Sequence, residues 1–173
     1  MKARLMSKTS VPLALAAACG LALGASAALG ASVNGHSAGF LKTTIQADTS
    51  EIMLGRMAEQ YGGPGVRRFG RMLIQDHAQH RNQAVALARQ VGVDVPNGPS
   101  FQANTEAAKL HMLKGRDFDR EFANYMANDH QKDIIEFRNE AQRREGPVSA
   151  LAQRTLPTLR KHLDAAHNLQ ERE

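Results

Sequence analysis

The stretch PGVRRFGRMLIQDHAQHRNQAVALARQV, residues 64–91, decides the fold expected of this chain. It begins with proline and is followed by Gly92, an arrangement typical of a helix with these bounds. Its small and apolar residues recur three and four positions apart, which predicts the core seam of a bundle helix. His77 and His80 both fall on that seam. Buried imidazoles are costly unless they are hydrogen-bonded or bound to metal, so the interior is the place to look for function.

Three further helical patterns accompany this one, at about residues 40–61, 117–145 and 147–170. Glycine and proline end and begin these patterns, and no alternating β-strand pattern occurs. The connection over residues 93–116 contains a short helical pattern at 101–114. It is long enough to run back along the second helix, which should measure roughly 40 Å. The sequence therefore predicts an all-α protein, a ferritin-like four-helix bundle with a long crossover between helices two and three.

The N-terminus has the features of a secretory signal peptide. Lys2, Arg4 and Lys8 precede an apolar run over residues 11–25, which ends in the small-residue cleavage signal Ala25-Ser26-Ala27. A lipoprotein signal that uses Cys19 is the alternative, but the four residues after it stay apolar. We expect a periplasmic or secreted protein with a signal peptide at 1–27, a linker at 28–39 and the helical bundle at 40–170.

Charge and cysteine content exclude several classes of protein. The chain has 22 basic and 17 acidic residues, and three of the basic ones fall in the signal peptide, so the mature chain has 19 against 17 and a net charge of +2. A charge so close to zero does not indicate binding to nucleic acid. The single cysteine, Cys19, leaves with the signal peptide, so the mature chain has no disulfide. No second long apolar run follows, so no transmembrane span is expected in the mature chain.

Every predicted long helix directs at least one possible metal ligand toward the interior. Three of the helices carry an i, i+3 pair whose members share a face: Asp48 and Glu51, His77 and His80, His130 and Asp133. Inward oxygen and imidazole ligands from four helices are typical of metal centres in bundles, which makes a divalent metal ion the candidate cofactor. The candidate ligands are Glu51, His77, His80, His130, Asp133 and His162, with Asp76 and Asp129 as secondary candidates. The alternative is that these groups hydrogen-bond to one another and bind no ligand.

Five motifs resemble a known family: Ser50–Ala58, Gln75–His77, Phe118–Arg120, Asn128–His130 and Thr155–Leu163. In this order, and over about residues 40–169, they resemble domain of unknown function 4142. The resemblance implies a secreted bacterial protein with a ferritin-like bundle and a peripheral association with the envelope, and the family has no settled activity. It extends to Glu51, Asp76, His77, Asp119, Asp129, His130 and His162, whereas His80 and Asp133 rest on helix geometry alone. The Glu-x-x-His pattern of standard di-iron bundles does not occur in the chain.

Three functional hypotheses follow. The first is a non-catalytic envelope or stress-related module whose interior His/Asp/Glu network is structural. The alternative is a metal-binding bundle, redox-active or not, and the third is pH sensing by the seam histidines. An enzyme is not indicated, because the sequence lacks a nucleophile elbow, a phosphate loop and a zinc-protease motif. The residue pattern predicts neither the metal, nor a substrate, nor the oligomeric state.

Overall fold

The computed structural model describes residues 33–171, and the predicted signal peptide with Cys19 lies outside them. The described residues contain no β-strand and form five α-helices: α1 (Gly35–Tyr61), α2 (Pro64–Gln90), α3 (Phe101–His111), α4 (Arg116–Arg143) and α5 (Gly146–Gln170). Within this part of the chain, no helix combines the length and the apolar character needed to cross a membrane. The prediction of an all-α protein is confirmed.

Most helix bounds lie within two residues of those predicted, and the exceptions are the start of α1 and the end of α3. α1 begins at Gly35 rather than near Phe40, because the side chain of Asn34 accepts a hydrogen bond from the Ser37 amide and caps the helix. The last five residues of the predicted linker are therefore helical. α4 ends at Arg143 because Arg144 adopts a left-handed conformation with φ of 55°.

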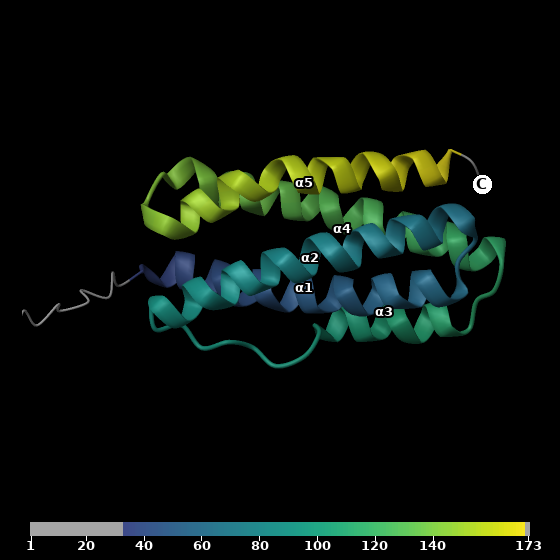
Figure 1. Ribbon diagram of the computed structural model, residues 1–173, viewed down its shortest axis with the longest axis horizontal. Coiled ribbons are helices and arrows are strands. Elements are labelled where there is room, and N and C mark those ends of the chain that lie inside the picture. The colour runs from purple at the N-terminus through teal and green to yellow at the C-terminus, as the bar shows by residue number, and fades with distance from the viewer. Residues whose placement is uncertain (1–32, 172–173) are drawn as a thin grey trace, which may run out of the picture.

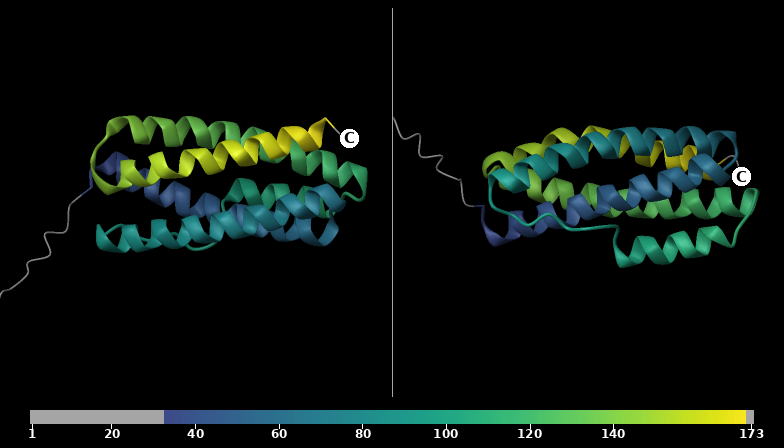
Figure 2. Two further views of the ribbon diagram at one scale, coloured as in Figure 1. Left: turned by 45° about the horizontal axis from the view of Figure 1, so that its top comes forward. Right: turned by 60° about the horizontal axis from the view of Figure 1, so that its bottom comes forward.

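The four long helices lie side by side, and the short helix α3 flanks them (Figure 1). α1 contacts α2 most closely and α4 contacts α5 most closely, which gives two helix hairpins. The connection from α2 to α3 runs along the outside of the molecule, and α3 then packs against α1 and α4 (Figures 1 and 2). This arrangement brings residues from both halves of the chain into one interior.

Two glycines set the distance between α1 and α2. A Cβ atom at Gly70 would lie 2.5 Å from the carbonyl oxygen of Gly55, and a Cβ at Gly55 would lie 2.9 Å from the carbonyl oxygen of Gly70. Real Cβ atoms do not approach backbone oxygens this closely, so the two helices pack backbone to backbone here because neither residue has a side chain. Glu51 on α1 and His77 on α2 lie within two turns of this contact.

The Gly62–Gly63 turn between α1 and α2 is tied to α4. Both carboxylate oxygens of Asp119 accept hydrogen bonds from the Gly63 amide, at 2.8 and 3.0 Å. A carboxylate is a strong acceptor for a backbone N–H group. Asp119 therefore has a structural position at one end of the helices, whereas the family motif marks it without a role.

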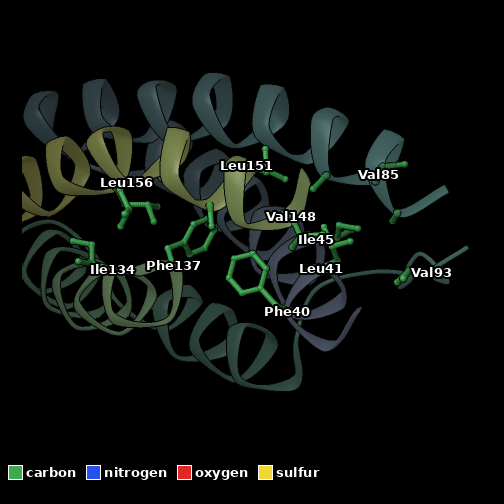
Figure 3. Packing of buried hydrophobic residues seen from close by; sticks show 14 residues of the cluster. Phe40, Leu41, Ile45, Val85, Val93, Ile134, Phe137, Val148, Leu151 and Leu156 are labelled. Atoms are coloured by element: carbon green, nitrogen blue, oxygen red, sulfur yellow. The ribbon is translucent and has the colours of Figure 1, made fainter. Parts of the chain in front are cut away.

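The core consists of two apolar clusters with a polar layer between them. One cluster includes Phe40, Ile45 and Phe137, with the rings of Phe40 and Phe137 packed edge to face at 4.9 Å (Figure 3). The other cluster includes Leu54, Leu73 and Phe122. On each long helix, the residues between the two clusters are buried and polar: Asp48 and Glu51 on α1, His77 and His80 on α2, His130 on α4, and His162 on α5.

Candidate functional site

Four ionisable side chains meet at the centre of the polar layer, one from each long helix. Glu51 on α1, His130 on α4 and His162 on α5 have no exposed surface, and His77 on α2 is 5% exposed. On its own helix, each of these residues lies between residues of the two apolar clusters. Burial of that apolar face therefore directs the side chain inward. All four were among the ligands predicted from the sequence.

Each of the three histidines donates one ring N–H to an acceptor that lies outside the group. His77 Nδ1 lies 2.9 Å from Asp48 Oδ1. His130 Nδ1 lies 3.0 Å from the Met126 carbonyl oxygen. His162 Nε2 lies 2.9 Å from Asp76 Oδ2. Because carboxylate and carbonyl oxygens can only accept, each of these nitrogens is the donor, and a neutral ring then carries its lone pair on the other nitrogen.

The remaining ring nitrogens face one another. One nitrogen from each of His77, His130 and His162 lies within 4.8 Å of the other two. His130 Nε2 is 3.2 Å from His162 Nδ1. Glu51 Oε2 completes the group, at 2.9 Å from His77 Nε2 and 3.3 Å from His130 Nε2. Despite the short distances, neither Glu51 oxygen nor His77 Nε2 forms an aligned hydrogen bond.

Electrostatics couple Glu51 to His77. Burial raises the pKa of the Glu51 carboxyl, but the adjacent imidazoles of His130 and His77 outweigh burial and lower this pKa to about 2. Burial likewise lowers the pKa of His77, but the charge of Glu51 and the hydrogen bond to Asp48 outweigh it and raise this pKa well above 6.5. In the absence of a cation, the layer therefore pairs the Glu51 carboxylate with a protonated His77.

The other two histidines are neutral near pH 7. Burial lowers the pKa of His130, and the charge on His77 acts in the same direction. Burial and the His77 charge lower the pKa of His162 to about 4. Two of the three imidazoles are thus already in the protonation state that a metal ligand requires.

A second group of three carboxylates shares Glu51. One oxygen each from Glu51, Asp129 and Asp133 lies within 4.8 Å of the others. Burial, followed by the charge of Glu51, raises the pKa of Asp129 to about 7 and that of Asp133 well above 3.8. Asp129 and Asp133 are partly buried and reach a surface groove, whereas Glu51 is fully enclosed. Without a cation, this group therefore retains protons that isolated carboxyls would lose.

His80, also predicted as a ligand, lies apart from the central group. Its Nδ1 contacts Asp48 Oδ1 and Oδ2 at 3.0 and 2.9 Å, and its Nε2 is buried without a hydrogen-bond partner. It lines a pocket on the α2–α5 face together with Asp76. Asp76 also holds an outer position, because it bonds the far nitrogen of His162 and lies 3.3 Å from Lys161 Nζ.

Two residues with supporting positions were not among the predicted site residues. Asp48 accepts from both His77 and His80, and its signal in the sequence was its place on the apolar face, three residues before Glu51. The Met126 carbonyl has no signal in the sequence, because any residue four positions before His130 would present its carbonyl to that ring.

Comparisons with known proteins identify a family for the chain. No curated protein and no solved structure matches it. One family model matches residues 22–169, which is most of the chain and includes every residue of the central group. The chain belongs to the family described as Domain of unknown function (DUF4142).

Proposed function

We propose that this protein binds a divalent transition-metal ion through His77, His130 and His162, with Glu51 as the fourth ligand. The observation that carries the proposal is the direction of the three imidazoles. Each donates its outer N–H to a carboxylate or carbonyl oxygen and turns its other nitrogen toward the same point. Histidines that ligate metals in proteins almost always have such an outer acceptor, which fixes the tautomer and the orientation of the ring.

The distances support the same assignment. In a tetrahedral site with metal–nitrogen bonds of about 2.0–2.1 Å, neighbouring ligand atoms are roughly 3.4 Å apart. The pairs His130–His162, His130–Glu51 and His77–Glu51 lie at 3.2, 3.3 and 2.9 Å. Two lone pairs from neutral imidazoles repel each other at 3.2 Å unless a proton or a cation lies between them. A metal ion among the three imidazoles removes this repulsion and lies close to Glu51 Oε2, whereas without an ion neither Glu51 oxygen forms an aligned hydrogen bond.

The ligand set favours a particular class of ion and role. Imidazole suits Zn²⁺, Cu²⁺, Fe²⁺ and Ni²⁺, while all-oxygen sites suit Mg²⁺ and Ca²⁺. Three imidazoles and a carboxylate fill all four positions around a four-coordinate ion. Structural metal sites are filled by protein ligands in this way, whereas catalytic sites keep one position open for water or substrate. The proposal is therefore metal holding without catalysis, which is the alternative to a purely structural network.

Zinc binding tests this proposal directly. The full chain, stripped with a chelator and titrated with Zn²⁺ in a calorimeter, should bind it at the histidine group. His77→Ala, His130→Ala and His162→Ala should each weaken binding by at least tenfold, since even indirect changes around a metal have effects of about 10–100-fold. His111→Ala is the matched control, because His111 is exposed at the end of α3. Wild-type affinity for Zn²⁺ and Cu²⁺ no higher than that of the triple alanine variant would overturn the proposal.

Fold and compartment are part of the proposal. The two hairpins and the long connection that carries α3 support a ferritin-like four-helix bundle with a crossover. The basic, apolar and small-residue pattern of residues 1–27 supports export to the periplasm or beyond. An exported metal-holding bundle fits an envelope or stress-related role. Detection of the protein only in the cytoplasmic fraction of its host would contradict the proposed compartment.

A further inference from the structure

A group of three carboxylates adjoins the histidine group. The carboxylates of Glu51, Asp129 and Asp133 each place an oxygen within 4.8 Å of the other two. The aspartates come from α4, one turn apart, and Glu51 comes from α1, so the group spans the contact between two helices. Three carboxylates this close repel one another unless a cation or protons lie among them.

Glu51 provides an independent sign that a ligand is missing from this group. It is completely buried, and both of its oxygens lack a hydrogen-bond partner. Burial of a carboxylate costs free energy, which its oxygens recover only through close polar or charged partners. Oε2 of Glu51 contacts the histidine group, at 2.9 Å from His77 Nε2 and 3.3 Å from His130 Nε2. Oε1 has no hydrogen-bond partner, and a cation held with Asp129 and Asp133 would provide one contact for it.

In the described part of the chain, no lysine or arginine forms an ion pair with Asp129 or Asp133. Within residues 33–171, the ion pairs made by lysine and arginine all go to other carboxylates. Lys132 lies nearby on the rim of the same groove but does not pair with either aspartate. An ion that arrives from solvent therefore meets no competing basic partner, and it displaces the protons held among the three carboxyls.

An entry path leads to this group from the surface. Asp129 and Asp133 line a groove of about 170 Å³ between α1, the start of α3, and α4. Ser50 and Gln102 also line it and add polar oxygens along the way. A hydrated cation can therefore reach the aspartates without passing through either apolar cluster.

We infer that Glu51, Asp129 and Asp133 form an all-oxygen site for a hard divalent cation such as Mn²⁺, and that Glu51 bridges this ion and the metal held by the histidines. The bridging part of this inference rests on the proposed function, whereas the carboxylate site stands on its own observations. Carboxylate and water ligands select hard ions, and imidazole selects softer ones. The centre would therefore hold two different metals, sorted by ligand chemistry.

Manganese titration tests the inference. The full chain is loaded with one equivalent of Zn²⁺ and titrated with Mn²⁺, and loss of the free Mn²⁺ signal in electron paramagnetic resonance counts the bound ions. We expect one Mn²⁺ per chain. Asp133→Asn and Asp129→Asn should weaken Mn²⁺ binding at least tenfold while the Zn²⁺ content stays unchanged. Asp164→Asn, an exposed acid on α5, is the matched control and should bind as the wild type does.

The outcomes separate this inference from the proposed function. A chain that binds Zn²⁺ but no Mn²⁺ overturns the second site and leaves the histidine site in place. Full Mn²⁺ affinity in both asparagine variants also overturns it, because the ion then lies elsewhere. A chain that binds Mn²⁺ at the aspartates but no Zn²⁺ overturns the histidine site and supports the carboxylate site alone.

A measurement on the wild type tests the bridge without relying on any variant. Two ions that share a carboxylate lie about 3.5–4 Å apart, close enough for strong magnetic coupling. With Cu²⁺ in the histidine site, added Mn²⁺ should broaden or remove the Cu²⁺ resonance. A Cu²⁺ resonance that is unchanged after Mn²⁺ has bound would show that the two ions do not share Glu51.

Discussion

The three inner histidines are held by three different acceptors: a carboxylate on α1, a backbone carbonyl on α4 and a partly exposed carboxylate on α2. What each imidazole can do depends on this outer partner, because the partner decides which nitrogen carries the proton. His80 illustrates the point. It also bonds Asp48, but its free nitrogen lies outside the central group, so an equally buried histidine takes no part in the site.

Asp48→Asn tests the role of the outer acceptor. An amide keeps an oxygen that can accept from the ring N–H, but it lacks the charge that makes the His77 ring a better ligand. We expect Zn²⁺ affinity to fall by roughly 10–100-fold, while the circular dichroism spectrum stays helical. Asp94→Asn is the control, because that side chain is 98% exposed. Equal Zn²⁺ affinity in the Asp48 and Asp94 variants would mean that Asp48 has no part in metal binding.

Metal binding should release about one proton near pH 7, and His77 is its source. The pKa of His77 is raised well above 6.5, so this ring must lose its proton before it can bind a metal. The pKa values of His130 and His162 are lowered, and that of Glu51 is about 2, so these ligands are already deprotonated. Because protons compete with the metal at His77, Zn²⁺ affinity should rise with pH until the pKa of His77 is passed.

Calorimetry in buffers of different ionisation enthalpy measures this proton number. His77→Gln should bind more weakly and release no proton. Zn²⁺ affinity that stays constant between pH 6 and pH 8 would contradict the assignment of the proton to His77.

On the scale of whole helices, the sequence predicted the elements well because their signals are local. Pro64 and Gly92 mark the ends of α2, and the three–four spacing gives the face that it buries. The start of α1 was missed, since its small residues at 35–39 look like a linker until the Asn34 cap is taken into account. The contact between α1 and α2 could not be predicted either, because nothing in the sequence pairs Gly55 with Gly70.

Gly70→Ala tests that contact. The added methyl group would lie 2.5 Å from the Gly55 carbonyl oxygen and 2.8 Å from the Ala58 side chain, so α1 and α2 must separate. Forced overpacking of this kind costs about 1–3 kcal/mol, which should lower the thermal midpoint of the metal-free protein. It should also weaken Zn²⁺ binding, because Glu51 and His77 lie on the two helices that move apart.

Gly39→Ala is the matched control for Gly70→Ala. Gly39 lies within α1, and nothing lies within 4 Å of the position that its Cβ would take. Alanine there should raise the free energy of unfolding by roughly 0.5–1 kcal/mol through helix propensity alone. If Gly70→Ala matched the stability and Zn²⁺ affinity of this control, the close helix contact would not matter to the site.

On the scale of the molecule, one polar layer crosses an otherwise apolar interior. The helical pattern predicted that His77, His130, His162 and Glu51 face inward, because a helix wheel gives the phase of each residue. The pattern could not predict that these four side chains lie together. That requires the four helices to have matching positions along the common axis, and packing between distant segments sets those positions. For the same reason, the helical pattern marked His80 and His77 equally as candidate ligands, although only His77 belongs to the central group.

A bound metal should raise the stability of the protein through this buried polar layer. In the metal-free protein, both Glu51 oxygens and His77 Nε2 lack an aligned hydrogen bond between the two apolar clusters, and an ion bound there would contact them. An ion that binds only the folded state contributes about 2.7 kcal/mol when its free concentration is one hundred times the dissociation constant. For a domain of this size, that contribution corresponds to a rise in thermal midpoint of roughly 5–10 °C.

Melting curves with Zn²⁺ and with a chelator measure this rise, and Glu51→Leu separates the two views of the layer. Leucine removes the buried charge and one ligand together. The variant should therefore gain much less from Zn²⁺ than the wild type does. Its metal-free midpoint should fall under either view, because the His77 charge loses one of its two carboxylate neighbours. If the layer were only structural, Zn²⁺ would shift neither protein. The shift that Zn²⁺ causes in the wild type, compared with the shift in the variant, thus distinguishes a site built for an ion from a network built for the fold.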